Sequence, residues 1–109
     1  MAQSVELALS DAGFVVDHAG DGRQALDKIT AAPARYQLLL TDDNMPKLTG
    51  IDLVRQLHAM KFAGRIIVVS GMINSEKERI YRELGIRTII EKPFKIPELI
   101  RSIERELGL

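Results

Sequence analysis

The sequence contains no cysteine and no tryptophan, and its fifteen basic and fifteen acidic residues cancel to a formal net charge of zero. Without cysteine there is neither a disulfide framework nor a thiolate metal site. The balanced charge supplies no overall attraction to nucleic acid or to an anionic membrane, so we expect neither as a direct partner. No apolar run approaches the roughly 20 residues of a membrane span, and the N-terminus lacks the pattern of a signal peptide. These absences predict a cytoplasmic protein.

Short apolar runs and segments with helical spacing of apolar residues alternate along the chain. We expect helices at 2–12, about 22–32, 51–60 and 75–84, a final helix with Pro97 in its first turn, and strands at 14–18, 36–41, 66–69 and 86–90. Strict alternation of this kind is typical of an α/β protein, in which helices cover both faces of a parallel sheet. With 109 residues, the whole of 1–109 is expected to form a single domain.

Three of the expected helices have recognisable start signals. Asp21 with Gln24, and Ser75 with Glu78, have the spacing of a capping box. Thr49 is a suitable N-cap for the helix at 51–60.

Three expected strands end in polar residues: Asp42 after 36–41, Ser70 after 66–69 and Lys92 after 86–90. Because parallel strands run in one direction, these ends meet at the same edge of the sheet, where open α/β sheets bind ligands. A carboxylate can act as a nucleophile and form an acyl phosphate. An ammonium and a hydroxyl can donate hydrogen bonds to phosphoryl oxygens as negative charge moves onto those oxygens during the transfer. The set is therefore suited to phosphoryl transfer.

Each residue taken alone has an ordinary structural explanation. An aspartate at a strand end often caps the following turn, a serine before glycine is commonly a turn residue, and a lysine before proline usually lies on the surface. Asp43 is expected to face solvent. The prediction therefore rests on the convergence of Asp42, Ser70 and Lys92.

Four motifs, taken together, resemble the response-regulator receiver domain of two-component signalling, and the resemblance covers nearly the whole chain. The family's phosphoacceptor loop resembles Leu-Leu-Leu-Thr-Asp42-Asp-Asn-Met-Pro with the following Gly50. Its Ser/Thr strand resembles Ile-Ile-Val-Val-Ser70-Gly, its lysine loop resembles Glu-Lys92-Pro-Phe, and the entry to its second helix resembles Ala19-Gly-Asp-Gly with Ala25-Leu26.

The resemblance implies a flavodoxin-like fold with strand order 2-1-3-4-5. It makes Asp42 the phosphoacceptor, Ser70 the switch hydroxyl and Lys92 the phosphate-binding cation, with a cis Lys92–Pro93 bond. Asp42 and the backbone carbonyl of Asn44 would be Mg²⁺ ligands. The implied partner is a histidine kinase or a phosphotransfer protein, and the implied role is signalling rather than enzymatic catalysis.

The chain departs from the family at its beginning, because the first strand and the acidic pair that ends it would lie before Met1. Asp42 and Asp43 cannot replace that pair, since adjacent residues of an extended chain point in opposite directions. We therefore expect weak Mg²⁺ binding. The missing strand belongs in the middle of the sheet, so the remaining strands close up, a partner chain supplies the strand, or the sequence is a fragment. An exchanged or rearranged homodimer is the favoured expectation.

A second departure is Ile89, which stands three residues before the lysine, where the family often has an aromatic ring. This puts a purely aromatic switch in doubt. Two other functions compete with phosphate acceptance. A phosphatase of the haloacid-dehalogenase class needs a second acid where this chain has Asn44. A receiver-like interaction module that no longer takes phosphate is compatible with the missing acidic pair.

Overall fold

A computed structural model describes residues 3–45 and 47–109, so the predictions that involve residues 2 and 46 lie outside the described residues. In chain order its elements are α1 (Gln3–Asp11), α2 (Gly22–Ala31), the short 3-10 helix η1 (Pro33–Arg35), β1 (Leu38–Asp42), α3 (Gly50–Ala59), β2 (Arg65–Ser70), α4 (Ser75–Glu83), β3 (Thr88–Glu91) and α5 (Ile96–Leu107).

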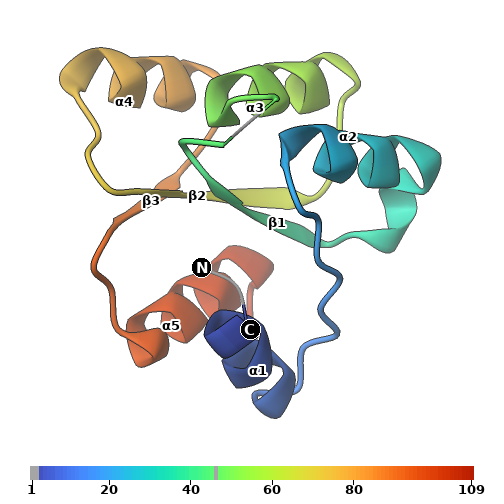
Figure 1. The fold of residues 1–109 in the computed structure, drawn as a ribbon, viewed down its shortest axis with the longest axis vertical. Coiled ribbons are helices and arrows are strands. Elements are labelled where there is room, and N and C mark those ends of the chain that lie inside the picture. Colours follow the sequence, from blue (N-terminus) through green and yellow to red (C-terminus); the bar gives the residue numbers. More distant parts are fainter. Residues whose placement is uncertain (1–2, 46) are drawn as a thin grey trace.

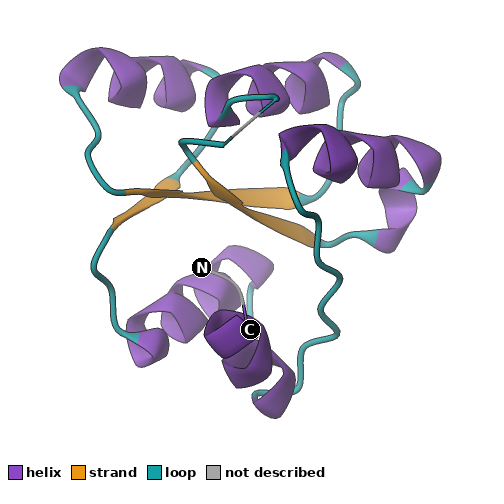
Figure 2. Cartoon of the chain, viewed as in Figure 1, coloured by secondary structure: helices purple, strands orange, loops and turns teal. Residues whose placement is uncertain are grey.

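The three strands form one parallel sheet in the order β1-β2-β3. Helices α2, α3 and α4 cover one face of this sheet, and α1 and α5 cover the other (Figure 1, Figure 2). The predicted α/β architecture with a helical layer on each face is therefore confirmed. The order matches the last three strands of the expected 2-1-3-4-5 arrangement.

The core lies on both sides of β2, whose successive side chains point to opposite faces of the sheet. Ile67 packs with Leu9 and Leu99 on the side of α1 and α5. Val68 packs with Val54 and Tyr81 on the side of α3 and α4. A strand buried on both faces needs a continuous apolar run, which explains why 66–69 lacks the alternation of a half-exposed strand.

The predicted starts of α2 and α3 are confirmed. Asp21 accepts a hydrogen bond from Gln24 N at 2.9 Å, and Gln24 Oε1 accepts one from Gly20 N at 2.8 Å. Thr49 Oγ1 accepts from Asp52 N at 3.2 Å. The bonds from Gln24 N and Asp52 N satisfy N–H groups that the first turn of a helix leaves without a backbone partner, and the bond from Gly20 N holds the residue just before the N-cap of α2.

The predicted first residue of α4, Ser75, is confirmed, but the predicted N-cap is wrong by one residue. Asn74, not Ser75, is the N-cap, and its side chain accepts a hydrogen bond from Lys77 N at 2.8 Å. Asparagine is among the best N-cap residues, and the backbone at Asn74 is extended as that position requires. The first predicted residue of the capping box is instead the first helical residue.

The strand predicted at 14–18 does not form. Within the described residues, no ladder joins this segment to β1, which is the edge of the sheet. Phe14 and Val16 are half-buried against the core beside α1 and α5, whereas Val15 is 99% exposed. The alternation of a strand is therefore present, but a strand exists only when its backbone groups pair with a neighbour. Three of the four predicted strands are observed.

The strand predicted at 86–90 begins two residues late, at Thr88. The backbone N–H of Ile86 donates to Tyr81 O at 3.0 Å, which closes the end of α4. Gly85 precedes it with a φ of 88°, in the left-handed region where glycine carries no Cβ penalty. Ile86 is consequently part of the helix-terminating turn, although its β-branched side chain is typical of a strand.

Candidate functional site

The carboxyl ends of the three strands meet at one edge of the sheet. Asp42 is paired in register with Val69 of β2, and Ser70 is paired with Glu91 of β3. The backbone N–H of Lys92 then donates to Ser70 O at 2.8 Å, which continues the pairing one residue beyond β3. The parallel register therefore brings Asp42, Ser70 and Lys92 to the same edge.

Asp42 has a donor to each of its carboxylate oxygens. Lys92 Nζ donates a hydrogen bond to Oδ2, and the backbone N–H of Asn44 donates to Oδ1 at 3.2 Å. The carboxylate is 22% exposed and the lysine side chain 37% exposed. The site is thus an accessible anion with a cation within contact distance, an arrangement that can receive a phosphoryl group and balance its charge.

Ser70 is almost fully buried, with 1% of its surface exposed. Within the described residues, no hydrogen bond links its hydroxyl to Asp42. Its backbone carbonyl holds the Lys92 loop. The structure therefore brings Ser70 to the edge of the site while pairing the carboxylate with Lys92.

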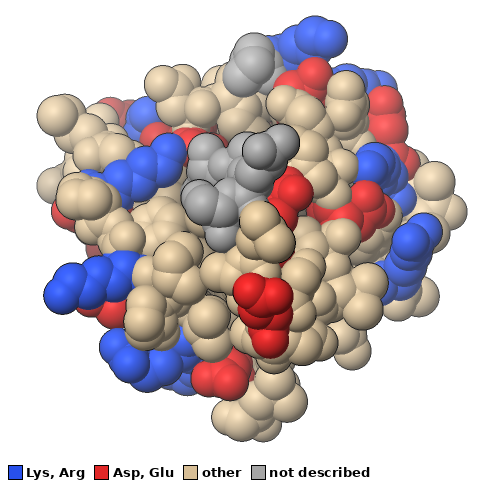
Figure 3. Space-filling view, turned by 60° about the horizontal axis from the view of Figure 1, so that its bottom comes forward, with Lys and Arg blue, Asp and Glu red and all other residues tan. Residues whose placement is uncertain are grey.

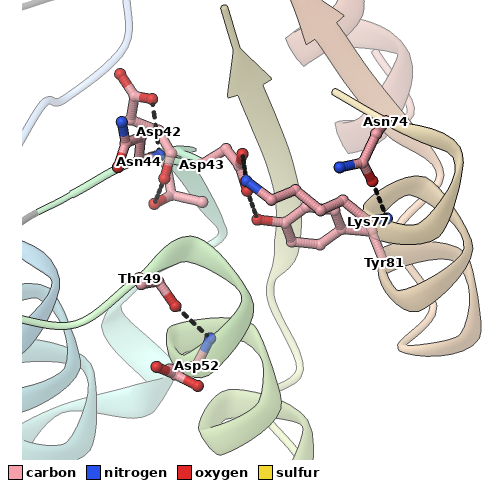
Figure 4. Close-up of polar contacts among 9 residues, drawn as sticks. Asp42, Asp43, Asn44, Thr49, Asp52, Asn74, Lys77 and Tyr81 are labelled. Atoms are coloured by element: carbon pink, nitrogen blue, oxygen red, sulfur yellow. Dashed lines mark hydrogen bonds and ion pairs between the residues drawn. The ribbon is translucent and has the colours of Figure 1, made fainter. Parts of the chain in front are cut away.

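Asp43 is not exposed, contrary to prediction. It is 6% exposed and lies between β1 and α4. Tyr81 Oη donates to its Oδ1, and Lys77 Nζ lies 3.1 Å from its Oδ2 (Figure 4). A buried carboxylate needs such partners, because an unpaired charge in the interior is costly. Asp42 and Asp43 point in opposite directions, as expected for neighbours on an extended chain.

Burial raises the pKa of the Tyr81 hydroxyl, and the hydrogen bond to Asp43 raises it further. The phenol therefore stays protonated and acts as a donor. Sequence reasoning did not identify Tyr81 or Lys77, which lie four residues apart and so on one face of α4. The available signal was a tyrosine beside Ile80 on a helix whose other residues are polar, and it pointed to the core rather than to Asp43.

The residues present supply an incomplete set of magnesium ligands. No group of three or more His, Cys, Asp or Glu residues able to hold a metal ion occurs in the described part of the chain. Asp43 cannot complete a set with Asp42, because its carboxylate is turned toward Lys77 and Tyr81. The donors that remain are the Asp42 carboxylate and the Asn44 carbonyl. Mg²⁺ held by so few protein oxygens keeps several waters.

The structure also shows one feature that the resemblance implies and one position where the chain departs from the family. The Lys92–Pro93 peptide bond is cis. Ile89 is half-buried and packs against the cluster that contains Val68 and Tyr81. Its aliphatic side chain has no polar group to exchange between solvent and core.

The surface carries charges of both signs. On the face shown in Figure 3, acidic and basic side chains are interspersed with uncharged ones. Among the residues that the structure describes, no helix has the length and apolar character needed to cross a membrane.

Comparisons with known proteins show what this fold and site resemble. The family model for the response regulator receiver domain matches residues 1–104. Response regulator ArlR of Staphylococcus epidermidis is 30% identical over 107 residues, which cover 98% of this chain and 48% of the relative. Cell cycle response regulator CtrA of Brucella ovis is 31% identical over 103 residues, covering 94% and 44%. The chain therefore spans about half the length of these relatives.

A solved structure gives the same result. Chemotaxis protein CheY4 of Vibrio cholerae superimposes with a TM-score of 0.86 and 31% identity, covering 96% of this chain and 88% of the other. The similarity in fold to CheY4 and the similarity in sequence to ArlR each extend over nearly all residues of this chain. The chain belongs to the response-regulator receiver domain family of two-component signalling.

Proposed function

We propose that Asp42 accepts a phosphoryl group from a histidine kinase or a phosphotransfer protein and thereby switches a partner-binding face. Receiver domains generally act in signalling rather than in catalysis, and they interact with partners of this kind. The observation that carries the proposal is the pairing of the Asp42 carboxylate with the Lys92 ammonium at the meeting point of three strand ends. In this proposal residues 1–109 act as one domain in the cytoplasm.

The transfer would need little chemistry beyond positioning. A carboxylate oxygen of Asp42 attacks the phosphorus of a phosphohistidine, the new O–P bond forms, and the N–P bond breaks with its electron pair left on the imidazole. Lys92 then donates to a phosphoryl oxygen instead of to the free carboxylate. Ser70 is the proposed switch hydroxyl, which would turn toward the phosphoryl group once that group is present.

Receiver domains generally bind Mg²⁺ at the phosphorylation site. In this chain Asp42 and the Asn44 carbonyl are the residues that would hold it, and the ion would offset negative charge on the phosphoryl oxygens. With one carboxylate in the set, we expect weaker binding than in receivers with an acidic pair. A titration of the unphosphorylated chain with Mg²⁺ measures this affinity.

Acetyl phosphate with Mg²⁺ tests phosphate acceptance directly. We expect one phosphoryl group per chain by intact mass, located on Asp42 by peptide mapping. Asp42→Asn should remove it. Asp52→Asn, which changes an exposed aspartate at the start of α3, should leave it in place. A phosphoryl group that persists in Asp42→Asn, or that maps to Asp43, would rule out the assignment.

A second candidate function is a receiver-like interaction module that takes no phosphate. The incomplete set of metal ligands in the described residues favours it. Such a module would bind its partner equally well before and after incubation with acetyl phosphate. Unchanged mass in the experiment above would support this alternative.

A further inference from the structure

Asp43 connects the end of β1 to two helices. Its backbone carbonyl accepts a hydrogen bond from Gly50 N, the first residue of α3, at 3.1 Å. Its carboxylate accepts from Tyr81 Oη and from Lys77 Nζ, both in α4. A single side chain, directly after Asp42, thus attaches α4 to the strand that carries the proposed phosphoacceptor (Figure 4).

The two partners of this carboxylate differ in their freedom to move. Tyr81 is fully buried, and its one hydroxyl proton is committed to Asp43. The Lys77 side chain is 41% exposed, against 4% for that of Asp43. An ammonium has three donors, so Lys77 can contact a second anion without leaving the first. Tyr81 is consequently the fixed contact and Lys77 the adjustable one.

The packing around Asp43 leaves little room for α4 to shift as a whole. A Cβ atom placed on Gly50 would lie 2.5 Å from Tyr81 Oη and 2.9 Å from the Cα of Asp43. Close-packed interiors of this kind respond by switching discrete contacts rather than by gradual deformation. A change in the charge near Asp43 would therefore act first on the exposed partner, Lys77.

The charge of Asp42 lies close to this network, because Asp42 directly precedes Asp43, whose carboxylate contacts Lys77 and Tyr81. The pKa of Tyr81 is raised mainly by burial and then by Asp43, and the negative charge of Asp42 makes a smaller contribution in the same direction. Phosphorylation would replace a charge of about −1 at Asp42 with one nearer −2. The electrostatic attraction on the Lys77 ammonium would increase accordingly.

We propose that Asp43 is a positioning residue that couples the charge state of Asp42 to the first turn of α4 through Lys77. This coupling rests on the proposed function, because phosphorylation is the event it would transmit. The backbone N–H of Lys77 donates to the N-cap Asn74 at 2.8 Å. Displacement of Lys77 therefore acts on the cap of α4 and on the preceding loop, where Met72 is 87% exposed.

A competing explanation is that Asp43 only anchors α4. An anchor stabilises the helix by the same amount whatever the charge at Asp42, whereas a coupling residue makes the two effects depend on each other. Amide hydrogen exchange of residues 75–83 separates the explanations, because it measures opening of α4 rather than stability alone.

The experiment compares the native chain, Asp42→Asn, Asp43→Asn and the double variant. Asparagine at position 43 keeps an oxygen for Tyr81 and removes the charge that faces Lys77. We expect Asp42→Asn to change exchange in the first turn of α4 by roughly fivefold or more. When Asp43→Asn is already present, Asp42→Asn should change exchange in the first turn of α4 by no more than the scatter between replicates. An equal change in both backgrounds would overturn the coupling.

Lys77→Gln provides a second test should Asp43→Asn fail to fold, because Lys77 is half-exposed. It should uncouple α4 from Asp42 in the same way. Arg79→Gln is the matched control, since Arg79 is an exposed cation of the same helix and should leave the response to Asp42→Asn unchanged. If the response of α4 to Asp42→Asn is lost in Arg79→Gln as well as in Lys77→Gln, α4 is weakened in general, and this result would contradict a route through Lys77.

Acetyl phosphate supplies an arm that separates this inference from the proposed function. If phosphate binds to Asp42 and α4 responds in the native chain but not in Lys77→Gln, both stand. If no phosphate is captured but the charge substitutions remain coupled, only the proposed function fails. If phosphate is captured and α4 of Lys77→Gln responds like the native chain, only the coupling fails.

Discussion

Lys92 donates a hydrogen bond from its ammonium to Oδ2 of Asp42, although fifty residues separate the two in the chain. The backbone of Lys92 is held at the same time, because its N–H donates to Ser70 O at 2.8 Å. One residue thus connects the ends of β1 and β2, with its backbone fixed and its half-exposed side chain free to follow a new anion.

The first prediction concerns this lysine. Lys92→Ala should lower the rate of phosphate capture from acetyl phosphate by about 10²-fold, the effect of losing a positioned donor to a developing anion. Stability should fall by no more than about 1 kcal/mol, since partly exposed ion pairs contribute little. Lys95→Ala, which changes an exposed lysine three residues away, is the control. Unfolding of Lys92→Ala under native conditions would instead indicate a structural role.

Tyr81→Phe should destabilise the chain by about 1–3 kcal/mol, because it removes a donor from a buried carboxylate and keeps the ring. Tyr36→Phe is a matched control: its hydroxyl also donates to an aspartate, Asp17, at 2.7 Å, but at an exposed contact. Urea unfolding of both variants gives the comparison. Equal losses would show that burial of Asp43 does not determine the cost.

Gly50→Ala should cost about 1–3 kcal/mol through overpacking, since the added Cβ would meet Tyr81 Oη at 2.5 Å. Gly71→Ala should be nearly neutral, because a Cβ at Gly71 meets nothing within 4 Å. Thermal unfolding of the two variants tests the difference. A Gly50→Ala chain as stable as the native one would mean that Tyr81 can move without cost.

Acidification should weaken the attachment of segment 14–18. Hydrogen bonds from Lys28 and Tyr36 lower the pKa of Asp17. A carboxyl whose pKa is depressed by folding adds stability above its unfolded pKa of about 4, and this contribution is lost as the pH falls through the folded value. Urea midpoints measured below about pH 4 should therefore decline less steeply for Asp17→Asn than for the native chain. Identical slopes would contradict the assignment.

The edge of β1 should promote self-association. Within the described residues, the outer side of β1 has no ladder partner, and Val15, in the segment between α1 and α2, is 99% exposed. Unpaired strand edges recruit other strands. Light scattering across a dilution series should show a dimer that dissociates into monomers as the chain is diluted. The substitution Val15→Lys should weaken this dimer. A monomer at all concentrations would show that this edge does not pair.

Local sequence patterns were sufficient to predict much of this protein. The apolar run before Asp42, the caps at Asp21 and Thr49 and the strict alternation of elements depend on neighbouring residues alone. They predicted the α/β class and the three observed strands. Because parallel strands end together, the order of elements also predicted that Asp42 and Lys92 would meet.

Tertiary structure decided the features that depend on distant partners. Segment 14–18 has the side-chain pattern of a strand, but its backbone lacks a neighbour with which to pair, and pairing is a property of the assembled sheet. Asp43 was expected in solvent because an isolated aspartate is best hydrated. It is buried because folding brings Tyr81 and Lys77, more than thirty residues away, to its two oxygens, and such donors offset the cost of removing the charge from water.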